Sequence, residues 1–166
     1  MSYIRTQQNR KFNYLDIQNN IVTIEEIASV LSKIPRWLGH TDNFYSVAQH
    51  CCWCYDNTKG NKLEALMHDA SEAYLGDCPT PLKKLLPEFN KLENQISILL
   101  SNTFDYKYPY SKETHNVDNL ALGFERYNIK KLNINYEPFD NIIPNIITYW
   151  KPKQAEKNFL KRYYNE

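Results

Sequence analysis

The stretch of sequence that decides the fold is KLEALMHDASEAYLG, residues 62–76. Asn61 precedes it as a favourable N-cap, and Glu64 follows three residues later. Gly76 stands where a glycine commonly ends a helix. The pattern therefore predicts one helix over residues 62–75.

Three chemically active side chains lie on this predicted helix. His68 and Asp69 are adjacent and therefore about 100° apart around the axis, and Glu72 follows them by four and three residues, so all three share one broad face. Their neighbours, such as Leu66 and Ala70, are apolar, so we expect the helix to be buried. A buried aspartate beside a histidine is costly unless something compensates its charge. A bound cation would do so.

Helical periodicity continues on both sides of this stretch. Further helices are predicted after the Thr23–Glu26 capping-box pattern up to Pro35, over 43–58, from Thr80-Pro81 with Thr80 as N-cap, over 88–103, over 112–132 with Val117, Leu120, Ala121 and Phe124 inward, and from Pro152. Residues 3–17 favour a small β-hairpin. The 166 residues are thus expected to form one all-α domain, 1–166, with an N-terminal hairpin.

Two more isolated polar side chains lie on otherwise apolar helices. His50 is next to Cys51 in the 43–58 helix, and Asp118 follows Val117 in the 112–132 helix. Taken singly, each is more often a hydrogen-bonded core residue or a cap than a ligand. Side chains from facing helices do, however, commonly converge on a metal. A mixed imidazole and carboxylate set suits Mn, Fe, Co, Ni or Zn, with Mg also possible.

The order of these residues resembles the signature of a known superfamily. His50, the pair His68-Asp69, and then Asp118 are similar to the H…HD…D pattern that names the HD superfamily of metal-dependent phosphohydrolases. The resemblance covers residues 35–125 and implies an HD-domain helical bundle.

Longer motifs narrow the resemblance. Residues 67–72, MHDASE, followed by residues 76–83, GDCPTPLK, are similar to bacterial HD-domain 5′-deoxynucleotidases. Residues 36–41, RWLGHT, with residues 45–50, YSVAQH, resemble phage-type relatives that include dATP triphosphohydrolases. The two motifs point to different substrates, a dNMP and a dNTP, and the choice between them stays open.

The resemblance also implies residue roles. The ligands of one divalent ion would be His50, His68, Asp69 and Asp118. Glu72 would be the catalytic general acid/base that orients or deprotonates the attacking water. Arg36 would bind phosphate and Trp37 would line the sugar or base pocket. Asp77 would face the deoxyribose, and Lys83 is a weaker phosphate candidate.

Two histidines have no single interpretation. His40 is either a phosphate contact or a loop histidine, and the two interpretations are about equally favoured. His115 precedes Asp118 by three residues, on roughly the same helix face, and we interpret it as exposed or as a support for the site.

HD relatives that act on cyclic dinucleotides carry a GYP element that this chain lacks, which disfavours that activity. Two alternative functions remain beside deoxynucleotide hydrolysis. One is hydrolysis of a signalling nucleotide such as guanosine tetraphosphate. HD relatives with that activity carry a second acid directly after the position of Glu72, where this chain has Ala73. The other is a non-catalytic nucleotide sensor, against which the intact Glu72 argues.

The composition excludes some classes of partner. Lys and Arg total 20 against 19 for Asp and Glu, so no duplex nucleic acid is expected as a ligand. The first 16 residues contain no apolar run of signal-peptide length, and no stretch reaches membrane-spanning length. A cytoplasmic protein that binds a small-molecule nucleotide is expected. Relatives in the superfamily are commonly dimers or larger, which implies a homo-oligomer.

Three of the four cysteines crowd one segment, Cys51-Cys52-Trp53-Cys54. The clustering argues against a disulfide framework. Cys51 and Cys54 have the spacing of a zinc half-site, but only the lone Cys78 stands elsewhere to complete it. We therefore expect these cysteines to pack as small hydrophobic residues.

Overall fold

The structure is a computed structural model that describes residues 2–130 and 147–165. It is mostly helical, with one small antiparallel hairpin. In chain order the elements are β1 Tyr3–Arg5, β2 Lys11–Asn13, the 3-10 helix η1 Ile17–Asn19, α1 Ile24–Leu31, the 3-10 turn η2 Arg36–Gly39, α2 Val47–Asn57, α3 Lys62–Met67, α4 Glu72–Leu75, α5 Thr80–Lys83, α6 Pro87–Phe104, α7 Lys112–Asn128 and α8 Pro152–Tyr163. The predicted all-α class with an N-terminal hairpin is confirmed at this level.

The hairpin is tied to the helices by aromatic side chains. Ile4 pairs with Phe12 in the sheet register. Phe12 is buried, and its ring stacks on Tyr74 of α4 with ring centroids 4.1 Å apart. The Tyr14 hydroxyl donates a hydrogen bond to the Tyr74 carbonyl. A two-stranded hairpin is marginal alone, so this docking stabilises it.

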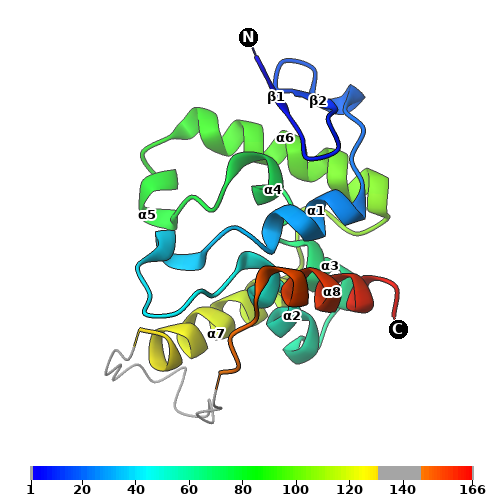
Figure 1. Cartoon of the computed structure of the whole chain (residues 1–166). Helices are drawn as coiled ribbons and strands as arrows, with labels where there is room; N and C mark the ends of the chain where they lie inside the picture. The colour runs from blue at the N-terminus through cyan, green and yellow to red at the C-terminus, as the bar shows by residue number, and fades with distance from the viewer. Residues whose placement is uncertain (1, 131–146, 166) are drawn as a thin grey trace.

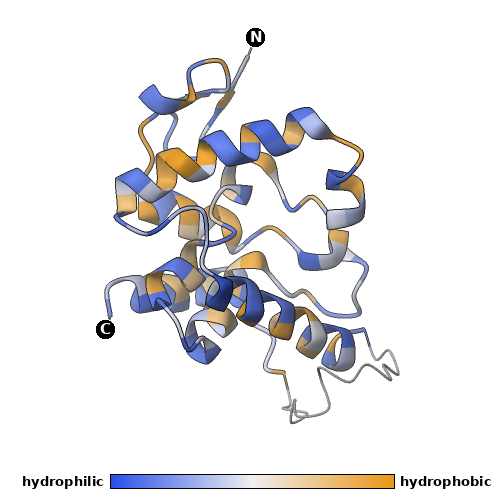
Figure 2. Cartoon of the chain, turned by 180° about the vertical axis from the view of Figure 1, so that it is seen from behind, coloured by the Kyte–Doolittle hydropathy of each residue, from blue (hydrophilic) through white to orange (hydrophobic). Residues whose placement is uncertain are grey.

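Helix α2 lies among several other helices. It packs against α3, α7 and α8, while α1 packs against α8 (Figure 1). Its buried residues include Val47, Ala48 and Cys51, all without exposed surface. Hydrophilic and hydrophobic residues alternate along the longer helices α6 and α7 (Figure 2), as expected for helices with one face on the core.

Several predicted helix ends are confirmed by the capping contacts. Thr23 accepts a hydrogen bond from the Glu26 amide, and Asn61 accepts one from the Glu64 amide. Gly76 ends α4 with φ of 80°, a left-handed conformation that glycine adopts without steric cost. The last helix begins at Pro152 as predicted.

Other boundaries differ from the prediction. The helix expected from residue 43 begins at Val47, because Ser46 is the N-cap and pairs with Pro35 in an isolated bridge. Thr80 is the first residue of α5 rather than its cap, and Pro79 precedes it. Helix α7 ends at Asn128, and residues 131–132 of the predicted helix lie outside the described residues.

One predicted inward position is wrong. Leu120 is 38% exposed, so it lies on the outer part of the α7 surface, whereas Val117 and Ala121 are buried as predicted.

The continuous helix predicted over 62–75 is also wrong. The chain forms α3 and α4 with a tight turn over residues 68–71 between them. Backbone hydrogen bonds in this turn span three residues, from Ala70 to Met67 and from Glu72 to Asp69. In a regular helix the Ala65 carbonyl would accept a hydrogen bond from the amide four residues later. Here it accepts one from the Nδ1–H of the His68 side chain. The side-chain bond thus replaces part of the helical ladder and tightens the backbone.

Among the described residues, no helix is both long and apolar enough to cross a lipid bilayer.

Candidate metal centre

Four side chains from three parts of the chain meet beside α2. His50 comes from α2, His68 and Asp69 from the turn after α3, and Asp118 from α7. The two imidazoles are buried, and their Nε2 atoms lie 3.2 Å apart. The side chain of Asp118 is 42% exposed, so the cluster opens towards solvent on that side.

The distances between these groups are those of ligands around one ion. His50 Nε2 lies 3.4 Å from Asp69 Oδ2 and 3.2 Å from Asp118 Oδ1. His68 Nε2 lies 3.3 Å and 3.6 Å from the same two atoms. Nitrogen and oxygen ligands bound at about 2.0–2.2 Å in tetrahedral directions are separated by roughly 3.3–3.6 Å. The structure therefore brings together all four residues that the sequence singled out as ligands.

Hydrogen bonds at the far side of each imidazole fix which nitrogen faces the cluster. His68 Nδ1 donates to the Ala65 carbonyl at 2.8 Å, and His50 Nδ1 donates to Glu125 Oε1 at 2.6 Å. Both Nε2 atoms are therefore directed at the centre with their lone pairs available. Such an arrangement is typical of metal-ligating histidines, whose outer nitrogen is held by a carboxylate or carbonyl.

The imidazoles and carboxylates of the cluster shift one another's pKa values. Burial acts to lower the pKa of His68, but Asp69 and Asp118 outweigh it and raise that pKa to about 9. The pKa of Asp118 is held well below its usual value, because its hydrogen bonds to His50 and His68 outweigh the effect of burial. Asp69 Oδ2 is buried and has no hydrogen-bond partner among the described residues. Two imidazoles and two carboxylates, one of which has a buried oxygen without a hydrogen bond, fit a divalent cation.

Glu125 of α7 was not predicted, although it organises one wall of the centre. Its side chain is completely buried. One carboxylate oxygen, Oε1, accepts the bond from His50. The other, Oε2, accepts hydrogen bonds from Arg36 Nε at 3.3 Å, Arg36 Nη2 at 3.2 Å and Trp37 Nε1 at 2.9 Å. Burial acts to raise the pKa of Glu125, but Arg36 and His50 outweigh it and keep the carboxylate ionised. The available signal was its position seven residues, or two helical turns, after Asp118.

Arg36 and Trp37 are held beside the metal ligands by this carboxylate. Arg36 Nη1 also lies 3.7 Å from Asp69 Oδ2. Trp37 and Leu38 have φ of 60° and 52°, a left-handed conformation that costs free energy in residues with bulky side chains. The hydrogen bond from Trp37 to Glu125 helps hold this strained turn in place.

Glu72, the predicted acid/base, begins α4 directly after the ligand turn. The residue is only 4% exposed, and its Oε2 atom has no hydrogen-bond partner among the described residues. Burial, and then the negative charges of Asp69 and Asp77, raise the pKa of Glu72 well above its usual value. The pKa of Asp77, which is half-buried, is raised by burial as well. The ligand Asp69 helps to raise the pKa of both Glu72 and Asp77.

The chain has relatives among known proteins. No family model matches it. It is 34% identical over 169 residues to the protein YfdR of Escherichia coli strain K12, and the match covers 98% of this chain and 94% of YfdR. The chain belongs to the YfdR family. It is also 37% identical over 89 residues to the protein RCAP_rcc00048 of Rhodobacter capsulatus, with 48% of this chain and 45% of that protein covered. Both relatives carry the name "uncharacterized protein", so the chemistry has to be argued from the site.

The remaining predicted substrate contacts of this YfdR-family chain lie less close to the ligands. Lys83 Nζ forms an ion pair with Glu93 at 2.5 Å, so its charge is already engaged. That charge still acts on Glu72 and Asp69, because both carboxylates help to raise the Lys83 pKa against the effect of burial.

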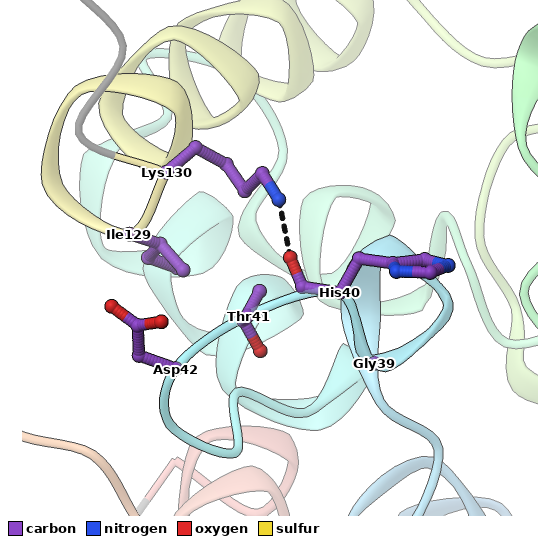
Figure 3. Close-up of a pocket in the computed structure, with 6 residues that line it drawn as sticks. All are labelled: Gly39, His40, Thr41, Asp42, Ile129 and Lys130. Carbon is purple, nitrogen blue, oxygen red and sulfur yellow. Dashed lines mark hydrogen bonds between the residues drawn. The ribbon is translucent and has the colours of Figure 1, made fainter.

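His40 is exposed and lies in a different pocket. Lys130 Nζ donates a hydrogen bond to the His40 carbonyl, while the His40 imidazole points away from Lys130 (Figure 3). The pocket has a volume of about 340 Å³ and is lined by Gly39, His40, Thr41, Asp42, Ile129 and Lys130. Within residues 2–130 and 147–165, no hydrogen bond or ion pair links the His40 imidazole to the four ligands. Whether His40 is a phosphate contact or a loop histidine stays open.

His115 is exposed on α7, as expected. Its ring lies edge-on to Tyr110, with centroids 6.2 Å apart.

The clustered cysteines of this YfdR-family chain are buried, as predicted. Cys51, Cys52 and Cys54 have no exposed surface. Cys54 nevertheless lies against the ligands, with its Sγ 3.7 Å from His50 Nε2. Cys51 Sγ lies within 4.8 Å of the ligand atoms of His68 and Asp69. The buried histidines, Cys54 and Asp69 thus form a cluster that could hold a metal ion.

Proposed function

We propose that this YfdR-family protein is a metal-dependent phosphohydrolase of the HD superfamily that acts on a deoxynucleotide. The observation that carries the proposal is the convergence of His50, His68, Asp69 and Asp118, which match the H…HD…D order, to separations of 3.2–3.6 Å. An ion bound there would polarise a phosphoryl oxygen and acidify a water molecule.

Glu72 is suited to move the proton that hydrolysis requires. Burial and the nearby Asp69 raise its pKa above that of a solvated glutamate, so it holds a proton more tightly than such a residue does. A cation that neutralises Asp69 would counteract part of this rise, and a general acid/base works best when its pKa lies near the operating pH. Glu72 Oε2 has no hydrogen-bond partner among the described residues, so it is free to bond to the attacking water.

Arg36 is placed to bind the phosphate. Its Nε and Nη2 atoms are occupied by Glu125, while Nη1 is directed towards Asp69 at 3.7 Å. The guanidinium is thus oriented before a substrate arrives, and its remaining donors fit a phosphoryl oxygen. A dNTP would need additional cations, and Lys83 would have to leave Glu93 to serve. The structure therefore lends more support to a monophosphate substrate.

Product analysis tests this proposal. The protein is incubated with panels of dNMPs, dNTPs and matching ribonucleotides under Mn, Co, Mg and Zn. Phosphate from a dNMP, or triphosphate from a dNTP, is the expected product. Binding of nucleotides without turnover under every metal would contradict the hydrolase and favour the nucleotide sensor.

Asp77→Ala should reduce the preference for deoxynucleotides over ribonucleotides. The proposal places the half-buried Asp77 carboxylate against the 3′-hydroxyl of a deoxyribose, where a 2′-hydroxyl would crowd it. Sites that reject an extra group by sterics or by unpaired polar atoms discriminate strongly. The measurement is the ratio of kcat/KM for matched deoxy and ribo substrates, with metal affinity as the control. A lower metal affinity with an unchanged ratio would show that Asp77 supports the ion and not the sugar.

Glu125→Gln should weaken metal binding by about 10–100-fold, the usual effect of losing a residue that orients a ligand. The amide keeps the shape of the side chain but removes the charge that holds His50 Nδ1 and Arg36. Affinity is measured by competition with a chelating indicator. Glu113→Gln, an exposed position on the same helix, is the matched control. Lower thermal stability with unchanged metal affinity would reduce Glu125 to a structural role.

A further inference from the structure

Cys54 lies between a small apolar cluster and the ligand histidines. It follows His50 by four residues on α2, so the two side chains share one face of the helix. It packs against Ala65, Val117 and Ala121. On its other side, its Sγ lies 3.7 Å from His50 Nε2, and the ligand atoms of Cys54, His50 and His68 all lie within 4.8 Å of one another.

The size of this triangle matches an ion such as zinc. With Cys54 the ion would have five protein ligands, whose neighbours lie at bond angles of about 90–120°. Zinc binds imidazole nitrogen at about 2.0–2.1 Å and thiolate sulfur at about 2.3 Å, so such neighbours lie roughly 2.8–3.6 Å apart for two nitrogens and roughly 3.1–3.8 Å for nitrogen and sulfur. The observed separations are 3.2 Å between the two Nε2 atoms and 3.7 Å between Nε2 and Sγ. The two histidines and Cys54 can therefore bind the same ion.

The neighbouring cysteines are weaker candidates. Cys52 interacts with Arg162 of α8. Cys51 is near His68 and Asp69, but it follows His50 directly and therefore points about 100° away from it around the helix. Cys54 alone among the three has a direct contact with an Nε2 atom.

We propose that Cys54 is a sulfur ligand of the metal centre and that it makes the site selective for thiophilic divalent ions, such as Zn or Co, over Mg. The inference rests on the metal centre of the proposed function and specifies its metal class. When the sulfur–metal bond forms, the S–H bond breaks and its proton is released to water. A soft thiolate favours such ions, whereas Mg prefers oxygen ligands. The ion would enter past Asp118, the most exposed of the proposed ligands.

Cobalt alone is the probe. The metal-free protein is titrated with Co²⁺ while its absorption spectrum is recorded. Wild type should show a thiolate-to-cobalt charge-transfer band in the near ultraviolet beside the visible bands of bound cobalt. Cys54→Ser should lose the charge-transfer band and keep the visible bands, because the imidazoles and carboxylates remain. Cys51→Ser and Cys52→Ser, two buried positions on the same helix, should keep both.

Zinc affinity provides a second readout. Loss of a residue that only orients a ligand weakens metal binding by ~10–100-fold. Cys54→Ser removes a ligand itself, so it should weaken zinc binding by at least this much and leave Mg affinity unchanged. Cys54→Ala, which introduces no hydroxyl into the core, replaces Cys54→Ser if circular dichroism shows that the serine variant is unfolded.

The outcomes separate this inference from the proposed function. Visible cobalt bands in wild type without a charge-transfer band would overturn the role of Cys54 and leave the metal centre intact. Loss of the band in Cys51→Ser, with Cys54→Ser unaffected, would also overturn it and assign the sulfur ligand to Cys51. Failure of wild type to bind cobalt at all would overturn both the inference and the metal-dependent function.

Discussion

Asp69→Ala is expected to abolish both metal binding and turnover. Asp69 Oδ2 lies 3.4 Å and 3.3 Å from the Nε2 atoms of the two ligand histidines, so its loss removes an anion from the centre of the cluster. It also removes the charge that Arg36 Nη1 faces at 3.7 Å. The Arg36 guanidinium, no longer faced by this carboxylate, would then repel a cation. Equilibrium dialysis with metal analysis should find no bound ion, and the hydrolysis assay should find no product.

Two further variants show whether this loss is specific. Asp69→Asn keeps the shape and removes the charge, so it should also lose the metal while its circular dichroism stays that of wild type. Asp105→Asn changes an exposed aspartate at the end of α6 and should bind metal normally. A folded Asp69→Ala protein with one ion per chain and the wild-type rate would show that the ligand assignment is wrong.

Glu72→Gln should separate binding from catalysis. The amide preserves the packing of a buried side chain but cannot hold or release the proton. Metal and nucleotide should still bind, while kcat falls by roughly 10²–10⁴, the usual contribution of a positioned general acid/base. Metal stoichiometry, nucleotide affinity and single-turnover rates are measured on the same preparation.

The pH dependence gives an independent check on Glu72. Wild type should show an ionisation in its rate profile that Glu72→Gln lacks, because that carboxyl group changes protonation during the reaction. Glu88→Gln, an exposed position on α6, should leave the profile unchanged. If Glu72→Gln loses metal as completely as the Asp69 variants do, Glu72 is a ligand and not the acid/base.

Local features of the fold could be predicted from the sequence because local chemistry determines them. The caps at Thr23 and Asn61 and the stop at Gly76 depend on side chains within three or four residues, and all three are confirmed. The break at residues 68–71 could not be predicted in this way. It goes with a hydrogen bond from the His68 side chain to the Ala65 carbonyl, three residues earlier. Helical periodicity does not predict which side chain will form such a bond.

The convergence of the four ligands shows the limit of spacing arguments. His50 and Asp118 are 68 positions apart in the sequence, yet their side chains lie 3.2 Å apart. Only the resemblance to a known ligand order connected them in advance. Residue type and an apolar neighbourhood alone had indicated ordinary core residues.

Glu125 and Cys54 were missed for different reasons. A glutamate on a surface helix is usually solvated. The three residues that donate hydrogen bonds to Glu125 are Arg36 and Trp37, which precede it by nearly 90 positions, and His50 of α2. Cys54 was correctly expected to be buried, but burial does not tell which side chain the sulfur will contact. For Glu125 the information lies in the packing of α7 and Arg36 around α2, which only the structure provides. For Cys54 the spacing of four residues from His50 was visible in the sequence, but spacing alone does not show that the sulfur lies beside the Nε2 atom that faces the centre.

The central claim is that one divalent ion, held by these residues, is required for hydrolysis of a deoxynucleotide. Metal-free protein is titrated with Mn²⁺ or Co²⁺ while bound metal and release of product from a dNMP or dNTP are measured in the same samples. The account predicts no turnover without metal and a rate that rises with occupancy to saturate at one ion per chain. Turnover that is independent of bound metal, or full occupancy of the site without any turnover, would contradict it.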